Sequence, residues 1–158
     1  MFKYRVDTLI SREDIAIRVK ELANEINKDF EGEEVLLVGL LRGSVVFLAD
    51  LVREIEVEAT MDFMTVSSYG NSTESSRDVK IIKDLEEDIR GRNVIIVEDI
   101  VDTGFTLRKV EDILMTREPK KLKIVTLLDK PERREVEIDV EYIGFKIQDD
   151  FVVGYGID

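Results

Sequence analysis

The chain contains no cysteine, no histidine and no tryptophan among its 158 residues. The lack of cysteine excludes a disulfide framework, a thiol nucleophile and a zinc-thiolate site. The lack of histidine excludes Ser-His-Asp and Cys-His catalysis, so carboxylates, lysine and tyrosine remain as the groups able to move protons. Any catalysis by this chain must therefore use those side chains.

Long apolar runs and an excess of basic charge are missing as well. The segment Met1–Asp7 lacks the apolar stretch of a secretory signal, and no later run approaches the ~18 apolar residues of a membrane span. The chain has 35 acidic and 23 basic residues, a formal net charge of −12, which disfavours sequence-independent binding to nucleic acid. These observations predict a cytoplasmic protein with neither a membrane nor a nucleic acid as partner.

Apolar and helical patterns alternate along the chain without an internal repeat or a linker. The content of hydrophobic residues, 44% of 158, is enough for one buried core but not for two independent ones. Helical periodicity begins at Ser11, at about Val45 and at Thr103. Strands are predicted at 35–40, 58–67, 79–83, 94–97, 123–128 and 140–143. Strands separated by helices predict a single α/β domain over residues 1–158, with a mainly parallel sheet flanked by helices.

Other segments are predicted from their polarity. The strand at 58–67 should be half-buried, because Ala59, Met61 and Phe63 alternate with polar residues. The polar stretch 69–77 should be a flexible loop that forms a small cap together with the chain ends. Two charge runs, residues 84–88 and 132–135, are interpreted as exposed turns or faces without a chemical role; they are Asp-Leu-Glu-Glu-Asp and Glu-Arg-Arg-Glu.

Residues 97–107 are the most informative stretch. They place Glu98, Asp99 and Asp102 directly after the apolar run Val94–Val97 and before a helix. In open α/β sheets, ligands bind at the carboxyl ends of strands, and the free N–H groups of a helix N-terminus attract phosphate. The first two acids are then available for hydroxyls or a metal ion, and the third for proton transfer.

A purely structural explanation of the same acids is weaker. Acidic residues often cap helices, and Asp102 alone would fit that role. The adjacent pair Glu98 and Asp99 has no evident capping role and adds repulsion between like charges. Gly104, with threonines close by on both sides, also lets the backbone approach an anion closely. The functional interpretation is therefore favoured.

This stretch resembles the phosphoribosyl pyrophosphate (PRPP) motif of type I phosphoribosyltransferases, in which two acids precede a phosphate-binding loop. Further blocks are similar to the bacterial hypoxanthine, or hypoxanthine-guanine, phosphoribosyltransferase family; they are Leu41–Leu51, Val66–Gly70, Leu127–Pro131 and Asp150–Asp158. The PRPP motif alone indicates only the superfamily. The blocks around Lys130 and Phe151 are specific to the branch that acts on 6-oxopurines.

The resemblance implies a fold and an activity. The fold is that of type I phosphoribosyltransferases, with a small hood and a flexible loop around Ser68 and Tyr69 that closes over the reacting centre. The activity is the Mg²⁺-dependent transfer of 5-phosphoribosyl from PRPP to hypoxanthine, with guanine as a second substrate. The products are IMP or GMP and pyrophosphate. The resemblance also implies a homodimer or homotetramer.

The resemblance further assigns roles to individual residues. Asp102 would be the general acid/base near purine N7, and a cis peptide would precede Arg42 in the loop that binds pyrophosphate. The residues expected to bind PRPP or nucleotide are Arg42, Gly43, Glu98, Asp99, Asp102, Thr103, Gly104, Phe105 and Thr106. Lys130 would donate to the purine O6, Phe151 would stack on the base, and Val152 would supply backbone contacts. Glu98, Asp99 and Asp158 would contribute to the metal site.

Each of these assignments has a structural alternative. Without the resemblance, the turn at Arg42 would be an ordinary strand-to-helix turn, Lys130 a surface lysine and Phe151 a core residue. Many members of the family have lysine in place of Arg42. Their sequence also normally continues beyond the position of Asp158 with a segment whose arginine helps to bind pyrophosphate, whereas this sequence stops at Asp158.

Three alternative functions remain open at the level of sequence. The first is a phosphoribosyltransferase that prefers xanthine or guanine. The second is a nucleotide-sensing regulator of the same fold that binds RNA or DNA, because a fold does not fix a function. The third is a catalytically weakened scaffold that keeps the 5′-phosphate site.

Overall fold

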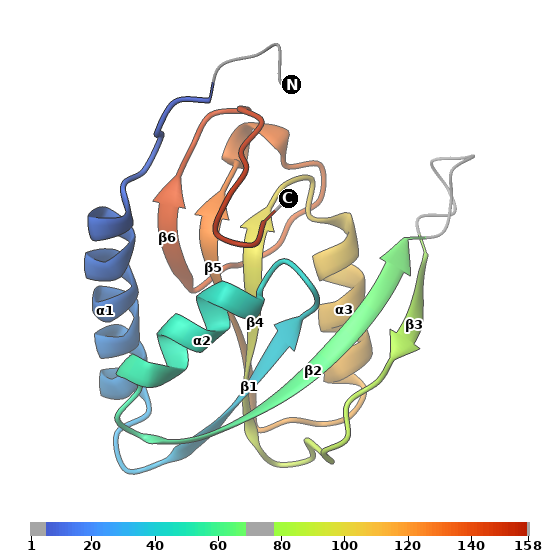
Figure 1. Cartoon of the computed structure of the whole chain (residues 1–158). Helices are drawn as coiled ribbons and strands as arrows, with labels where there is room; N and C mark the ends of the chain where they lie inside the picture. The colour runs from blue at the N-terminus through green and yellow to red at the C-terminus, as the bar shows by residue number, and fades with distance from the viewer. Residues whose placement is uncertain (1–5, 69–77, 158) are drawn as a thin grey trace.

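A six-stranded sheet forms the centre of the computed structural model, which describes residues 6–68 and 78–157 (Figure 1). Its elements in chain order are α1 (Arg12–Asp29), β1 (Glu34–Leu40), α2 (Val45–Glu54), β2 (Glu58–Ser68), β3 (Val79–Lys83), β4 (Asn93–Val101), α3 (Phe105–Met115), β5 (Lys121–Asp129), a 3₁₀ helix (Pro131–Arg133) and β6 (Tyr142–Lys146).

The order of the strands across the sheet is β3-β2-β1-β4-β5-β6. All neighbouring pairs are parallel except β2 and β3 at one edge. β2 and β3 lie on one side of β1, whereas β4, β5 and β6 lie on its other side. The direction in which successive strands are added therefore reverses between β1 and β4. Ligands of such sheets bind in the crevice at the carboxyl ends of the strands, where the order reverses. The mainly parallel α/β sheet predicted from sequence is confirmed.

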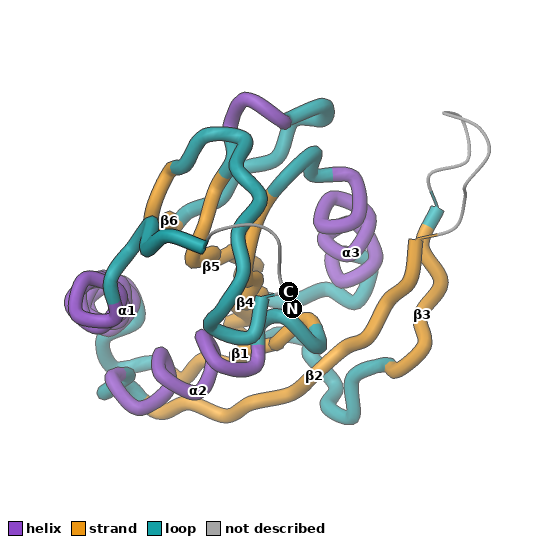
Figure 2. Tube along the Cα trace, turned by 45° about the horizontal axis from the view of Figure 1, so that its top comes forward, coloured by secondary structure: helices purple, strands orange, loops and turns teal. Residues whose placement is uncertain are grey.

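Both faces of the central strands are buried by helices. One apolar cluster joins this sheet to α1 and α2, and a second joins its other face to α3. Figure 2 shows the helices in these two groups on opposite sides of the sheet. The continuous apolar runs Val35–Val38 and Val94–Val97 follow from this arrangement, because a strand covered on both faces has no polar side.

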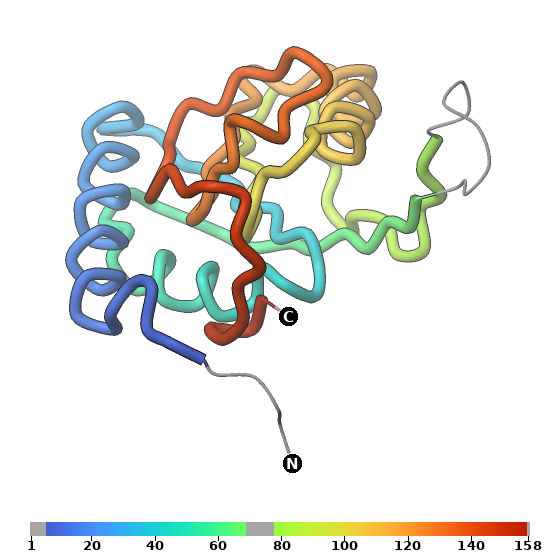
Figure 3. Tube along the Cα trace, turned by 90° about the horizontal axis from the view of Figure 1, so that it is seen from above, coloured from blue at the N-terminus to red at the C-terminus, as the bar shows by residue number. Residues whose placement is uncertain are grey.

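The chain beyond β6 folds back over the carboxyl ends of the strands. Viewed from above, residues 147–157 run from β6 towards α2 (Figure 3). Val152, Tyr155 and Ile157 pack against the apolar cluster on the side of α1 and α2. The C-terminal segment thus contributes to the cap that the sequence predicts.

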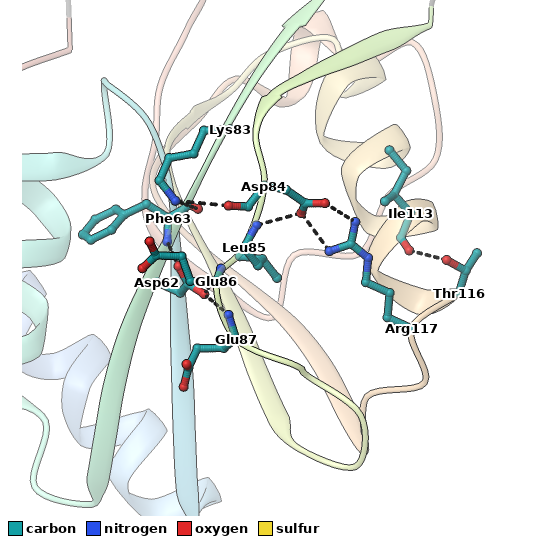
Figure 4. A network of polar contacts seen from close by, with 10 residues as sticks. All are labelled: Asp62, Phe63, Lys83, Asp84, Leu85, Glu86, Glu87, Ile113, Thr116 and Arg117. Atoms are coloured by element: carbon teal, nitrogen blue, oxygen red, sulfur yellow. Dashed lines mark hydrogen bonds and ion pairs between the residues drawn. The ribbon is translucent and has the colours of Figure 1, made fainter.

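The turn between β3 and β4 is fastened at two points (Figure 4). The buried carboxylate of Asp62 in β2 accepts the backbone N–H groups of Glu86 and Glu87, both at 2.9 Å. Arg117, just after α3, forms two 2.8 Å hydrogen bonds with Asp84. The charge run 84–88 is therefore a structural turn, as predicted.

The helix starts agree with the sequence, and some strand bounds differ. Ser11 Oγ accepts the backbone N–H of Asp14 at 3.0 Å and caps α1 as predicted. β4 continues four residues past Val97, because Val101 pairs with Asp129 of β5. β6 begins at Tyr142, two residues later than predicted.

The predicted alternation in β2 is wrong at one position. Met61 is 48% exposed, whereas Asp62 and Met64, on the other face, are buried. Asp62 is buried because its carboxylate receives the turn after β3. Within the described residues, no helix is long and apolar enough to cross a membrane.

Candidate active site

The carboxyl ends of β1, β4 and β5 bring three short loops together beneath the C-terminal segment. Leu41–Ser44 follows β1, Asp102–Gly104 follows β4 and Lys130 follows β5. The backbone N–H of Lys130 donates to Val101 O at 2.9 Å, which fixes the end of β5 beside the end of β4. This is the sheet edge at which the sequence predicts a site.

The loop after β1 packs directly against the acids of β4. The peptide bond between Leu41 and Arg42 is cis, as the resemblance implies. Buried Ser44 donates from Oγ to Leu40 O at 2.7 Å and closes the turn into α2. At Gly43 a Cβ atom would overlap Asp99 Oδ2, so a larger residue would require Asp99 or the loop to move. Arg42 is exposed at the tip of the loop.

Glu98 and Asp99 are adjacent, partly buried carboxylates at the end of β4. Burial, together with the hydrogen bond and charge of Asp99, raises the pKa of Glu98 well above its ordinary value. Two crowded carboxylates are hard oxygen donors, and a divalent cation or hydroxyl donors would relieve their repulsion. The residues described contain no group of three or more metal-binding side chains. Asp158, the third predicted metal ligand, lies outside the described residues.

The turn after β4 forms the N-terminus of α3. Gly104 has φ +92°, a left-handed conformation that glycine adopts without strain. The first N–H groups of α3 therefore begin at Phe105, where a phosphate would meet them. At the end of β2, Ser68 Oγ lies 3.1 Å from Thr106 Oγ1. Tyr69, the other predicted loop residue, lies outside the described residues.

A segment after the 3₁₀ helix supports this turn from beneath. The backbone N–H of Glu135 donates to Thr103 O at 2.9 Å, and that of Val136 donates to it at 3.4 Å. Side chains of Arg134, Val136 and Ile138 lie directly under Gly104, where they would meet a Cβ atom within 3.2–3.4 Å. We call residues 134–138 the supporting segment.

Lys130 is buried as a whole residue, since only 8% of it is exposed. Its Nζ lies 3.6 Å from Asp149 Oδ1 in the C-terminal segment. On the other side of Asp149, Oδ2 lies 3.7 Å from Arg133 Nη1, and Arg133 Nε donates to Asp102 Oδ1 at 2.8 Å. Asp102 and Lys130 are therefore linked by two residues of alternating charge.

The C-terminal segment carries an exposed aromatic ring two residues after Asp149. Phe151 is 92% exposed, while its neighbour Val152 packs inward. The hydroxyl of Tyr155 donates to Asp50 of α2 and ties the segment to the helix that follows the Arg42 loop. Phe151 is thus not the core residue that its apolar neighbours would suggest.

The structure brings most of the predicted residues to the carboxyl ends of the strands; these are Arg42, Gly43, Glu98, Asp99, Asp102, Thr103, Gly104, Phe105, Thr106 and Lys130. Val152 packs against the apolar cluster on the side of α1 and α2. Sequence reasoning missed Arg133, Arg134 and Asp149. The run 132–135 is mostly exposed and forms the 3₁₀ helix and the turn after it, as predicted, yet Arg133 contacts Asp102, and Arg134 pairs with buried Asp129. The two arginines could have been suspected from their place in the sequence, because they follow Lys130, a predicted site residue, by only three and four residues.

Comparison with known sequences agrees with this geometry. The model of the phosphoribosyl transferase domain matches residues 6–158. Over 99% of its length, the chain is 57% identical to the hypoxanthine phosphoribosyltransferase of Salmonella typhimurium, of which it covers 89%. It is 47% identical to the hypoxanthine-guanine phosphoribosyltransferase of Bacillus subtilis, with 100% of this chain and 88% of that protein covered.

Solved structures give the same result. A hypoxanthine-guanine phosphoribosyltransferase of Bacillus anthracis superposes with a TM-score of 0.91 at 52% identity, covering 97% of this chain and 88% of that one. A mutant hypoxanthine phosphoribosyltransferase of Trypanosoma cruzi, in a ternary complex with substrates, gives 0.93 at 40% identity, covering 99% and 89%. The predicted type I phosphoribosyltransferase fold is confirmed, and the chain belongs to the phosphoribosyltransferase family.

Proposed function

We propose that the protein transfers 5-phosphoribosyl from PRPP to N9 of hypoxanthine, and also of guanine, and so works in purine salvage. The bond from C1′ to pyrophosphate breaks as the bond from C1′ to N9 forms, with inversion at C1′. The observation that carries the proposal is the meeting, at one sheet edge, of the turn Asp102–Gly104, the acids Glu98 and Asp99, and buried Lys130. The relatives named above support the choice of a 6-oxopurine.

The PRPP half of the site would be formed by the loops after β1 and β4. The 5′-phosphate would meet the N–H groups at the start of α3 and the hydroxyls of Thr103 and Thr106, where the helix dipole favours an anion. Glu98 and Asp99 would accept hydrogen bonds from the ribose hydroxyls. The N–H groups of the loop at Arg42 would receive the pyrophosphate.

Glu98 and Asp99 also suit Mg²⁺, because this ion is often held by one or two carboxylates together with phosphate oxygens of a substrate. Bound there, it would neutralise charge on the departing pyrophosphate. A cation bound there would also stabilise the charged form of Glu98, which burial disfavours.

The purine half would lie between Lys130 and the C-terminal segment. The ammonium of Lys130 would donate to the exocyclic O6, and adenine would be rejected because its amino group is itself a donor. Phe151 exposes its ring for stacking on the base. Asp102 would accept the proton from N7 as N9 bonds to C1′.

The experiment that tests the function is an absorbance assay of nucleotide formation from PRPP and Mg²⁺ with hypoxanthine, guanine, xanthine and adenine. Turnover of hypoxanthine and guanine but not of adenine is expected. Faster turnover of xanthine than of hypoxanthine would favour the rival base preference. Failure with every base would contradict the proposal and favour a weakened scaffold or a regulator.

Two variants assign the roles within that assay. Asp102→Asn should lower kcat by about a hundredfold, since general acid–base catalysis contributes ~10²–10⁴-fold, and should leave IMP binding largely intact. Lys130→Ala should raise KM for hypoxanthine much more than KM for PRPP. An Asp102→Asn variant as active as its parent would refute the base assignment.

A further inference from the structure

We infer that Arg133 is a positioning residue, which holds the Asp102 carboxylate in place to accept the proton that the purine loses and, through Asp149, couples it to Lys130. The inference rests on the proposed function. It adds Arg133 and Asp149 to a site in which neither has a role so far.

The backbone directs Arg133 towards Asp102. Lys130 is fixed to the end of β4 through its hydrogen bond to Val101 O, and the 3₁₀ helix Pro131–Arg133 begins immediately after it. The N–H of Arg133 donates to Lys130 O at 3.0 Å, so the chain turns back within one tight turn. The side chain of Arg133 therefore returns to the edge from which the turn starts.

The contact with Asp102 leaves half of the carboxylate available. Arg133 Nε donates to Asp102 Oδ1 at 2.8 Å, and among the described residues no hydrogen bond to Oδ2 is present. A carboxylate held through one oxygen keeps the other directed at its target, which is the arrangement of a base supported by a second residue. The Asp102 carboxylate raises the pKa of Arg133 further, so the guanidinium stays charged.

Stability alone does not account for this pair. Both side chains are nearly half exposed, at 46% and 44%, and exposed ion pairs contribute only about 0–1 kcal/mol to folding. The value of the contact lies in position, because displacement of a catalytic group by about 1 Å can lower a rate by about a hundredfold.

Asp149 extends the effect to the second purine contact. Its two carboxylate oxygens lie 3.7 Å from Arg133 Nη1 and 3.6 Å from Lys130 Nζ. The order of charges is therefore Asp102, Arg133, Asp149 and Lys130, alternating in sign. Asp102, proposed to act at N7, and Lys130, proposed to bind O6, are therefore held in one network. The two atoms that they would contact, N7 and O6, belong to the same purine.

The test is a double-mutant cycle in kcat and KM. Arg133→Met, which keeps the length of the side chain and removes its charge, should lower kcat with hypoxanthine by about tenfold or more and leave KM for PRPP within about twofold. Arg133→Lys should recover most of that loss. In the Asp102→Asn background, Arg133→Met should change kcat by less than about twofold, because residues that act as a unit are not additive.

The matched control is Arg90→Met, which removes an exposed arginine that pairs with Glu118. It should leave both kinetic constants unchanged. The inference is overturned if Arg133→Met is as harmful in the Asp102→Asn background as in the parent, if Asp102→Asn itself has no effect, or if the loss lies in KM for PRPP, which would make Arg133 a direct phosphate ligand.

Binding provides an answer that does not depend on turnover. By calorimetry, Arg133→Met should weaken binding of IMP by about fivefold or more relative to ribose 5-phosphate, which lacks the base. An equal loss for both ligands, or no loss, overturns the inference. Inactivity of the unmodified protein towards all purines would refute the proposed function instead, and this binding comparison would still decide the role of Arg133.

Discussion

At the scale of single residues, the missing side chain of Gly43 sets how closely two loops approach. Asp99 Oδ2 occupies the place where a Cβ atom would stand. With any other residue at this position, either the loop that follows β1 or the Asp99 side chain would have to move. Close packing of two backbone segments around a carboxylate is a feature that no charge pattern of the sequence reveals.

Gly43→Ala should raise KM for PRPP by about tenfold or more, because the added methyl group must displace either the Arg42 loop or Asp99. Stability should fall by only about 1–3 kcal/mol, the usual cost of overpacking. Steady-state kinetics and urea unfolding of the same preparation separate the two effects. A variant with unchanged KM for PRPP would show that Asp99 and the loop do not act together.

Glu98 makes stability depend on pH with a definite sign. Its pKa is raised in the folded protein, chiefly by burial, so folding favours the protonated form. This contribution to stability is fully present below the ordinary pKa of 4.5 and is lost as pH rises through the folded pKa. Burial of this carboxyl group therefore lowers stability at neutral and alkaline pH.

Glu98→Gln should consequently unfold at a higher urea concentration than its parent at pH 8, and the difference should shrink as the pH falls to about 4. Glu31→Gln, the same change at an exposed position, is the control and should show no such trend. A difference that stays constant with pH would contradict the raised pKa. Activity should fall in Glu98→Gln even as stability rises.

At the scale of elements, a hydrogen bond ties the C-terminal segment to a helix. Tyr155 donates to Asp50 in α2, and burial raises the pKa of the phenol, so it remains a donor at working pH. α2 begins directly after the Arg42 loop. The segment that carries Phe151 is therefore fastened to the element that carries the proposed pyrophosphate loop.

Tyr155→Phe should raise KM for hypoxanthine by about threefold to tenfold and change KM for PRPP much less, because a hydrogen bond to a charged group contributes ~1.5–3 kcal/mol. Tyr142→Phe is a close control. It removes a hydroxyl that donates to Asp29 at 2.6 Å, between β6 and α1, and it should lower stability without raising KM for the purine. Equal kinetic effects of the two variants would argue against a specific role of Tyr155.

Local sequence patterns predict the elements well and the contacts between loops poorly. Apolar runs and helical spacing locate the α-helices and the strands, because burial on the two sheet faces imposes them. The extension of β4 to Val101 depends on pairing with β5, which no local pattern encodes. From the sequence, Arg133 is one charged residue in an exposed run, and only the fold shows that its side chain contacts Asp102. Its role therefore depends on tertiary structure alone.

At the scale of the whole molecule, the excess of acids argues against the nucleic-acid-binding alternative. The net charge is −12, and binding to nucleic acid depends on neutralising phosphates with basic side chains. This excess does not contradict the proposed small anionic substrates, because the start of α3, Arg42 and Lys130 would supply local N–H groups and positive charge at the carboxyl ends of the strands. A homodimer or homotetramer stays a prediction, which light scattering can check.

Titration with labelled duplex RNA and DNA should accordingly give no measurable binding at about 50 mM salt, where electrostatic attraction is strong, and none at about 200 mM. IMP added to the same preparation should raise the melting temperature, since a ligand of the folded state stabilises it. Binding of nucleic acid that weakens steeply with salt would instead support a regulator. The IMP arm shows that the protein used is folded and competent.

The supporting segment has a consequence for how this site can change over evolution or by design. Residues 134–138 hold the turn after β4 from beneath, and they follow Lys130 closely in the chain. An insertion, deletion or grafted loop that alters base preference at Lys130 would also move the platform of the phosphate turn. Under the proposed function, base preference and phosphate affinity would therefore change together, and exchange of single side chains would be the more direct route to a new purine specificity than a change in loop length.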